Sequence, residues 1–125
     1  MYKVMLIGLG GFLGAIGRHG LASLAHRIAG EGFLVGTLLV NILGCLVIGG
    51  FMAVAEESQL SRSDVHFFVI IGLIGSFTTF SAFAHETHEL LRNRSMVAAG
   101  GNILANVLVG VCAVMAGRGL VKLVA

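Results

Sequence analysis

The hydrophobic positions of this 125-residue chain fall into four long runs that are separated by short polar segments. Each run is apolar nearly all round, so no helical periodicity picks out one buried face. A helix that crosses a lipid bilayer needs about 20 mostly apolar residues, and each run is long enough. The pattern therefore predicts four membrane-spanning helices, at about residues 4–26, 33–55, 65–90 and 95–121.

The composition supports a membrane protein rather than a soluble one. Charged residues make up 11% of the chain, whereas a soluble globular domain carries roughly 25%. A net charge of +2 is too small to suggest a polyanion, which argues against a nucleic-acid partner. The polar connections leave no room for a further domain. We therefore predict a single all-α, four-helix membrane domain over residues 1–125, in contact with membrane lipid.

The charges that flank the runs leave the membrane orientation open. With four spans, the N-terminus, the loop between the second and third helices and the C-terminus share one side. That side carries Lys3, Arg62, Arg118 and Lys122, and the other carries Arg27, Arg92 and Arg94, with Arg18 as an uncertain addition. The positive-inside rule needs a larger imbalance than this. Either the chain inserts both ways and pairs as an antiparallel dimer, or subtler signals fix one topology.

Glycine gives a second argument for oligomerisation, because 19 of the residues are glycine and many lie inside the apolar runs. Small residues let helices approach closely in lipid, where the hydrophobic effect does not drive helices together. Four thin helices cannot enclose a solvated pathway and also bury their polar residues. The pattern predicts tight packing within and between chains.

Polar residues inside the runs are expensive in a membrane and therefore point to function. Arg18 lies in the last third of the first run, where it either reaches the headgroups or forms an electropositive vestibule for an anion. Asn41 follows Thr37 by one turn, and Asn106 follows Asn102 by one turn. These side chains either join helices by hydrogen bonds or form a polar track that replaces the water of an ion. The number of amides favours the track.

The third run contains the segment 75–83, which reads Gly-Ser-Phe-Thr-Thr-Phe-Ser-Ala-Phe. Glycine, serine and threonine weaken a helix, so we expect a break here, in the middle of the membrane. Carbonyl groups freed by such a break, together with threonine hydroxyls, suit a small cation such as sodium. Phe80 and Phe83 share a helix face. Their positive ring edges could line an anion path, or the rings could simply pack against lipid or core.

Three motifs in the runs resemble a known family. The motifs are Gly11-x-x-Gly14-Ala15-x-x-Arg18, Gly36-Thr37-Leu38-x-x-Asn41-x-x-Gly44 and Gly72-x-x-Gly75-Ser76-x-Thr78-Thr79-Phe80-Ser81-x-Phe83. Together they resemble the Fluc/CrcB fluoride channels over the whole chain. The resemblance implies a passive fluoride channel in the bacterial inner membrane, which exports fluoride and limits its toxicity. It also implies an antiparallel homodimer with two pores.

The resemblance also assigns roles to individual residues. Backbone carbonyls of Gly75 and Thr78 in both subunits would hold a central sodium ion. The expected fluoride-lining residues are Arg18, Thr37, Asn41, Thr79, Phe80, Ser81, Phe83 and Asn106, of which Arg18, Thr37 and Asn106 come from the residue pattern rather than the family. Ala82 stands where the family often has threonine, so that position receives no role.

Three other functions compete with that of a channel. A small proton-coupled exporter needs an acid within the membrane, and we expect none of the six acidic residues to lie deep in a span, Glu86 being the nearest. A structural membrane subunit would explain the glycines, but not the threonine and phenylalanine segment. An enzyme is not expected, because no nucleophile is matched with a base.

Overall fold

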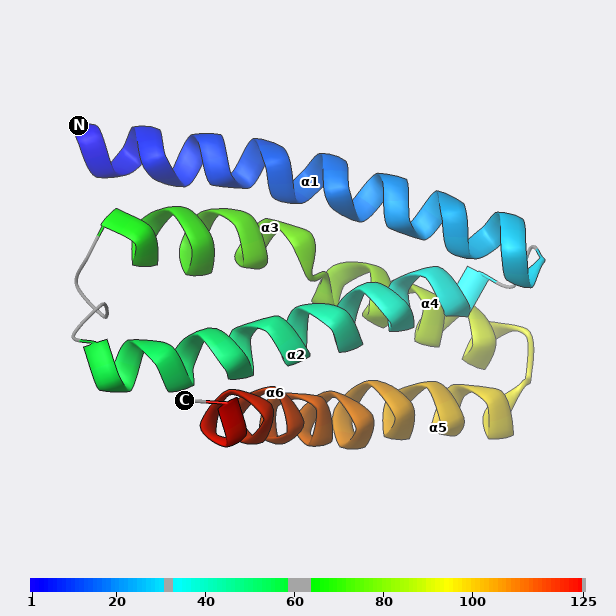
Figure 1. Ribbon diagram of the computed structural model, residues 1–125. Helices are drawn as coiled ribbons and strands as arrows, with labels where there is room; N and C mark the ends of the chain where they lie inside the picture. The colour runs from blue at the N-terminus through cyan, green and yellow to red at the C-terminus, as the bar shows by residue number, and fades with distance from the viewer. Residues whose placement is uncertain (31–32, 59–63, 125) are drawn as a thin grey trace.

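The computed structural model describes residues 1–30, 33–58 and 64–124, and these form helices joined by short connections (Figure 1). The first two crossings are single α-helices, whereas the third and fourth are built from several segments. In order, the elements are α1 (Tyr2–Ala29), α2 (Phe33–Ser58), η2 (His66–Ile74), α3 (Gly75–Phe77), α4 (Phe80–Arg92), α5 (Met96–Leu104), η3 (Ala105–Val109) and α6 (Gly110–Val124). Arg62, which was counted above among the flanking charges, lies outside the described residues.

Four stretches are long and apolar enough to cross a membrane: Tyr2–Ala29, Leu34–Glu56, His66–Arg92 and Met96–Val124. The prediction of an all-helical chain with four such helices is confirmed. The N-terminus, the C-terminal end of α2 and the C-terminal end of α6 lie at the same end of the bundle (Figure 1). This is the arrangement of a multi-pass membrane protein.

Glycines allow close helix contacts within the described part of the chain. α2 packs along α6, and α1 packs along η2. A Cβ added at Gly49 would overlap the Val114 backbone, and one added at Gly117 would overlap the Leu46 backbone. The predicted tight packing is therefore found within the chain, because these helices meet backbone to backbone.

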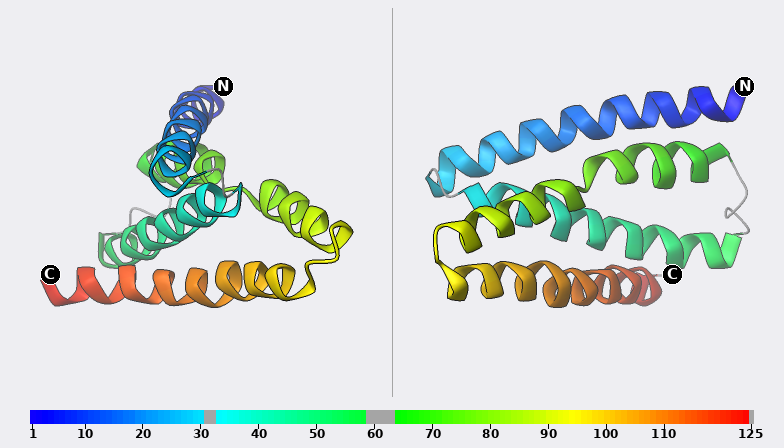
Figure 2. Two further views of the ribbon diagram at one scale, coloured as in Figure 1. Left: turned by 90° about the vertical axis from the view of Figure 1, so that its right-hand side faces the viewer. Right: turned by 180° about the vertical axis from the view of Figure 1, so that it is seen from behind.

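The third crossing is interrupted at Thr78 and Thr79. Their backbones are extended, with φ −77° and ψ 155° at Thr78 and φ −147° and ψ 110° at Thr79. Thr79 then caps α4, because its Oγ1 accepts a hydrogen bond of 3.2 Å from the Ala82 N–H. The segments η2 and α3 stay beside α1, whereas α4 turns away and packs against α5 (Figures 1 and 2).

An ion pair at the end of the bundle joins α2 to α6. Arg118 donates two hydrogen bonds to Glu56, of 2.7 and 2.6 Å, but both side chains are more than 40% exposed. We expect Glu56→Gln to lower the free energy of unfolding by no more than about 1 kcal/mol, because exposed ion pairs contribute little. Thermal unfolding in detergent measures this loss. A loss above about 2 kcal/mol, with Glu89→Gln unchanged, would contradict the estimate.

Candidate ion pathway

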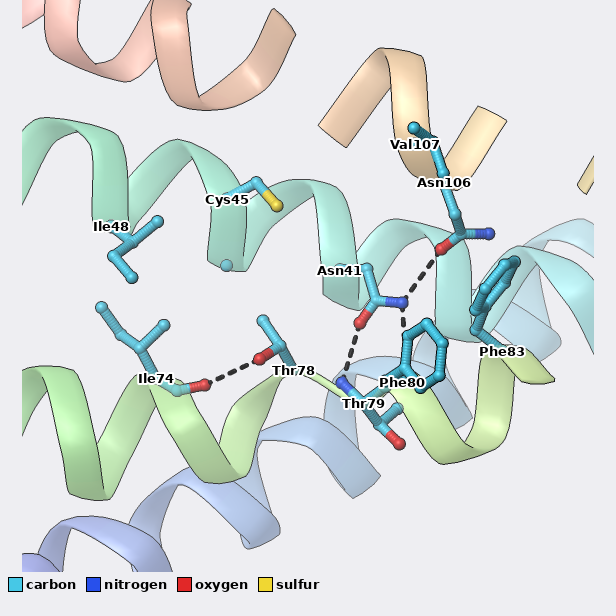
Figure 3. A pocket seen from close by; sticks show the side chains of 11 residues that line it. Asn41, Cys45, Ile48, Ile74, Thr78, Thr79, Phe80, Phe83, Asn106 and Val107 are labelled. Atoms are coloured by element: carbon cyan, nitrogen blue, oxygen red, sulfur yellow. Dashed lines mark hydrogen bonds between the residues drawn. The ribbon is translucent and has the colours of Figure 1, made fainter. Parts of the chain in front are cut away.

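The interruption of the third crossing is stabilised by a side chain from α2. The Thr79 N–H donates to Asn41 Oδ1 at 2.8 Å, and Asn41 Nδ2 donates to the Thr79 carbonyl at 3.2 Å (Figure 3). The amide of Asn41 thus takes the place of the helical hydrogen bonds that Thr79 has lost. It also donates to Asn106 Oδ1 at 2.9 Å, which links the break to η3.

A chain of hydrogen bonds continues from Asn106 back to α4. Asn106 Nδ2 donates to Asn102 Oδ1 at 3.0 Å, and Asn102 Nδ2 donates to Thr87 Oγ1 at 3.0 Å. Thr87 in turn donates to the Phe83 carbonyl at 2.8 Å. The amides that the sequence singled out are therefore brought together, and in this structure they join helices. π-Helical segments such as η3, which carries Asn106, often mark functional sites.

A cavity of about 300 Å³, here called the central cavity, opens beside the break (Figure 3). Of the predicted site residues, it is lined by Asn41, Thr78, Thr79, Phe80, Phe83 and Asn106. The rings of Phe80 and Phe83 lie 5.4 Å apart between centroids and are tilted by 59°. Phe80 is 78% exposed, so the central cavity opens on the surface of the chain.

A second cavity of about 510 Å³, here called the Arg18 cavity, lies between α1, α2 and α4. Arg18, Thr37, Thr79 and Ser81 line it, and Thr79 Oγ1 lies 3.2 Å from Ser81 Oγ. Thr79 lines both cavities, because its extended backbone places it between them. All the predicted site residues except Gly75 therefore line one of two cavities, and Thr79 lines both.

The carbonyl groups proposed for sodium lack two of the donors that an unbroken helix would supply. In an unbroken helix, the N–H groups of Thr79 and Ala82 would bind the carbonyls of Gly75 and Thr78. Here the side chains of Asn41 and Thr79 accept from those two N–H groups instead. The two carbonyl oxygens are thereby released from these helical donors, which suits a small hard cation. In residues 1–30, 33–58 and 64–124, no cluster of histidine, cysteine and acidic side chains could hold a metal.

Glu86, the acid expected to lie nearest to a span, is buried within the chain. It belongs to the crossing His66–Arg92, is 2% exposed and accepts a hydrogen bond from Thr37 Oγ1. Its position three residues after Phe83 places it near the same face of α4, and this was the available signal. Glu31 and the side chain of Glu57 lie outside the described part of the chain.

Comparisons with known proteins agree over nearly the whole chain. A family model described as "CrcB-like protein, Camphor Resistance (CrcB)" matches residues 5–118. A protein of Dehalococcoides mccartyi named "Fluoride-specific ion channel FluC" is 39% identical over 117 residues, or 94% of this chain and 90% of its own. Proteins with the same name from Methylobacillus flagellatus and Clostridium perfringens are 40% and 38% identical and cover 98% and 95% of this chain, and 97% and 93% of their own.

These relatives bear on two of the predictions. They are named as ion channels, a class without catalysis, so the prediction that the chain is not an enzyme is confirmed. The buried Glu86 weakens the reason for setting aside a proton-coupled exporter. The names of the relatives nevertheless favour a channel.

Proposed function

We propose that this chain, which belongs to the CrcB family, forms a passive channel selective for fluoride. The observation that carries the proposal is near-full-length similarity to several proteins named fluoride-specific ion channels. The geometry supports it, because hydrogen-bond donors and aromatic rings converge at the break in the third crossing.

The pathway runs from the Arg18 cavity to the central cavity. Arg18 attracts the anion, and the hydroxyls of Thr37, Thr79 and Ser81 receive it. Fluoride is small and holds its water strongly, so each lost water must be replaced by a donor. Beyond Thr79, the positive edges of the Phe80 and Phe83 rings replace further waters. The amides of Asn41 and Asn106 line the same passage, where each would exchange one of its present hydrogen bonds for one to fluoride. The narrow aromatic passage rejects the larger chloride ion.

The functional unit is an antiparallel homodimer with two pores, and the breaks of the two subunits face each other at mid-membrane. The exposed Phe80 supports this assembly, because the central cavity needs a second surface to enclose an ion. The nearly balanced flanking charges support insertion in both orientations. The channel lies in the bacterial inner membrane, where a negative-inside potential drives fluoride out and limits its toxicity.

A structural sodium ion at the dimer interface completes the proposal. Carbonyls of Gly75 and Thr78 from both subunits would hold it, since the N–H groups that would occupy them in a helix bind elsewhere. When bound, the ion supplies a fixed positive charge that offsets the cost of bringing an anion into a low dielectric.

Efflux from liposomes tests the channel and its aromatic passage. With valinomycin carrying potassium, we expect fast fluoride loss and no chloride loss, each followed with its own electrode. Phe80→Ile should slow fluoride loss at least about tenfold, because aliphatic carbon lacks the positive edge of the ring. Phe12→Ile is the matched control, since Phe12 is an exposed phenylalanine on α1. Fluoride loss no faster than from protein-free liposomes would refute the channel, and equal effects of the two variants would refute the role of Phe80.

A further inference from the structure

A buried polar cluster lies where α1, α2 and α4 meet, beside the Arg18 cavity. Thr37 joins the two, because its side chain lines that cavity and donates to the Glu86 carboxyl group. His26 belongs to the same corner of the bundle. Its Nε2 atom would lie 2.9 Å from a Cβ added at Gly36, the residue before Thr37. Ala22, one turn before His26, also lines the cavity.

Two atoms of this cluster lack partners. Among the described residues, Glu86 Oε2 and His26 Nε2 are both buried and without a hydrogen bond. The whole Glu86 residue is only 2% exposed. An unpaired buried polar atom is costly, so a purely structural network would normally satisfy both atoms. The cluster therefore leaves one carboxyl oxygen and one imidazole nitrogen without a hydrogen-bond partner.

Charged or titratable groups come to this corner from α1 and α4, and Arg18 and His19 of α1 line the adjoining Arg18 cavity. His26 from α1 and His85 from α4 itself interact electrostatically with its carboxyl group. α2 contributes the neutral Thr37 hydroxyl, and the packed helix α5 carries no titratable side chain. His85 is exposed, whereas His26 Nε2 is buried. A histidine ordinarily changes charge between pH 5 and 8.

We propose that His26 is a proton-binding site that controls fluoride entry from the Arg18 cavity through Glu86 and Thr37. The inference rests on the proposed channel function. With His26 neutral, the carboxylate of Glu86 keeps the hydrogen bond donated by the Thr37 hydroxyl, and its negative charge repels an approaching anion. Once protonated, His26 donates from Nε2 to Glu86 Oε2, and the pair becomes neutral overall. Thr37 can then donate to fluoride, so fluoride conductance rises as the pH falls from 8 to 6.

Single-channel recording tests this directly, with equal fluoride and equal pH on both sides of a planar bilayer. Current is the suitable readout, because hydrogen fluoride crosses bare lipid without carrying charge. We expect the wild-type current to rise about threefold from pH 8 to pH 6, as one neutralised charge lowers the entry barrier. His26→Gln should give the wild-type current at pH 8 and no rise at pH 6. Glu86→Gln should also give a current independent of pH.

His88→Gln is the matched control, because His88 is a 71% exposed histidine on the same helix as Glu86. It should keep the full rise, as should His85→Gln. A wild-type current that does not change with pH overturns the inference and leaves the channel intact. A rise that survives His26→Gln, or one that disappears in His85→Gln, also overturns it. The absence of fluoride current at every pH overturns the proposed channel, and the inference with it.

Discussion

Substitution of Asn41 by aspartate is expected to lower fluoride efflux at least about 100-fold. Aspartate keeps an oxygen that accepts from the Thr79 N–H, so the capped break is retained. It loses the two donations from Nδ2, to the Thr79 carbonyl and to Asn106, and it adds a negative charge at the central cavity. Like charges brought together cost several kcal/mol, and each 1.4 kcal/mol corresponds to about a tenfold change in rate.

The measurement is fluoride efflux from liposomes, together with size-exclusion chromatography to show that the variant folds. Asn93→Asp is the matched control, because Asn93 ends α4 at the turn before α5 and lines neither cavity. It should conduct like the wild type. Efflux through Asn41→Asp within tenfold of the wild-type rate would show that the ion does not pass Asn41.

Substitution of Gly117 by alanine is expected to prevent stable folding of the chain. The added Cβ would overlap the backbone of Leu46 on α2, and it would lie 3.0 Å from the Gly50 nitrogen. Backbone atoms cannot turn aside as a side chain can, so α2 and α6 must separate along their main contact. Overpacking typically costs 1–3 kcal/mol, and we expect at least about 3 kcal/mol here because rigid backbone is displaced.

Gly119→Ala provides the control on the same helix, because nothing lies within 4 Å of a Cβ at that position. It should unfold at or slightly above the wild-type temperature, since alanine favours a helix by about 0.5–1 kcal/mol over glycine. Thermal unfolding in detergent compares the two variants. A Gly117→Ala protein as stable as Gly119→Ala would show that α2 and α6 do not meet so closely.

The sequence alone was sufficient to predict those features that depend on residues close together along the chain. Long uncharged runs have few alternatives to membrane-spanning helices, so the four crossings could be predicted. The glycine, serine and threonine residues of segment 75–83 predict a break in the third helix, and the structure has extended backbone at Thr78 and Thr79. The motif residues around that break also identified the family, which the comparisons confirm. The functions assigned to single residues remain predictions.

Only the tertiary structure decided which polar groups meet. Thr37 and Glu86 are 49 residues apart, and Asn41 and Asn106 are 65 apart, yet each pair is hydrogen-bonded. A helix that is apolar all round has no distinct face that would show which side packs against its neighbours. The side-chain pairings between such helices therefore cannot be read from the sequence. The sequence placed Glu86 near the end of its span, but it could not show that packing against α2 buries this side chain. The sequence alone thus determined the number of crossings and the weak point of the third, because both depend on neighbouring residues. The rotation and crossing of the helices placed Thr79 between two cavities and brought His26 within electrostatic range of Glu86, because both depend on contacts between distant segments.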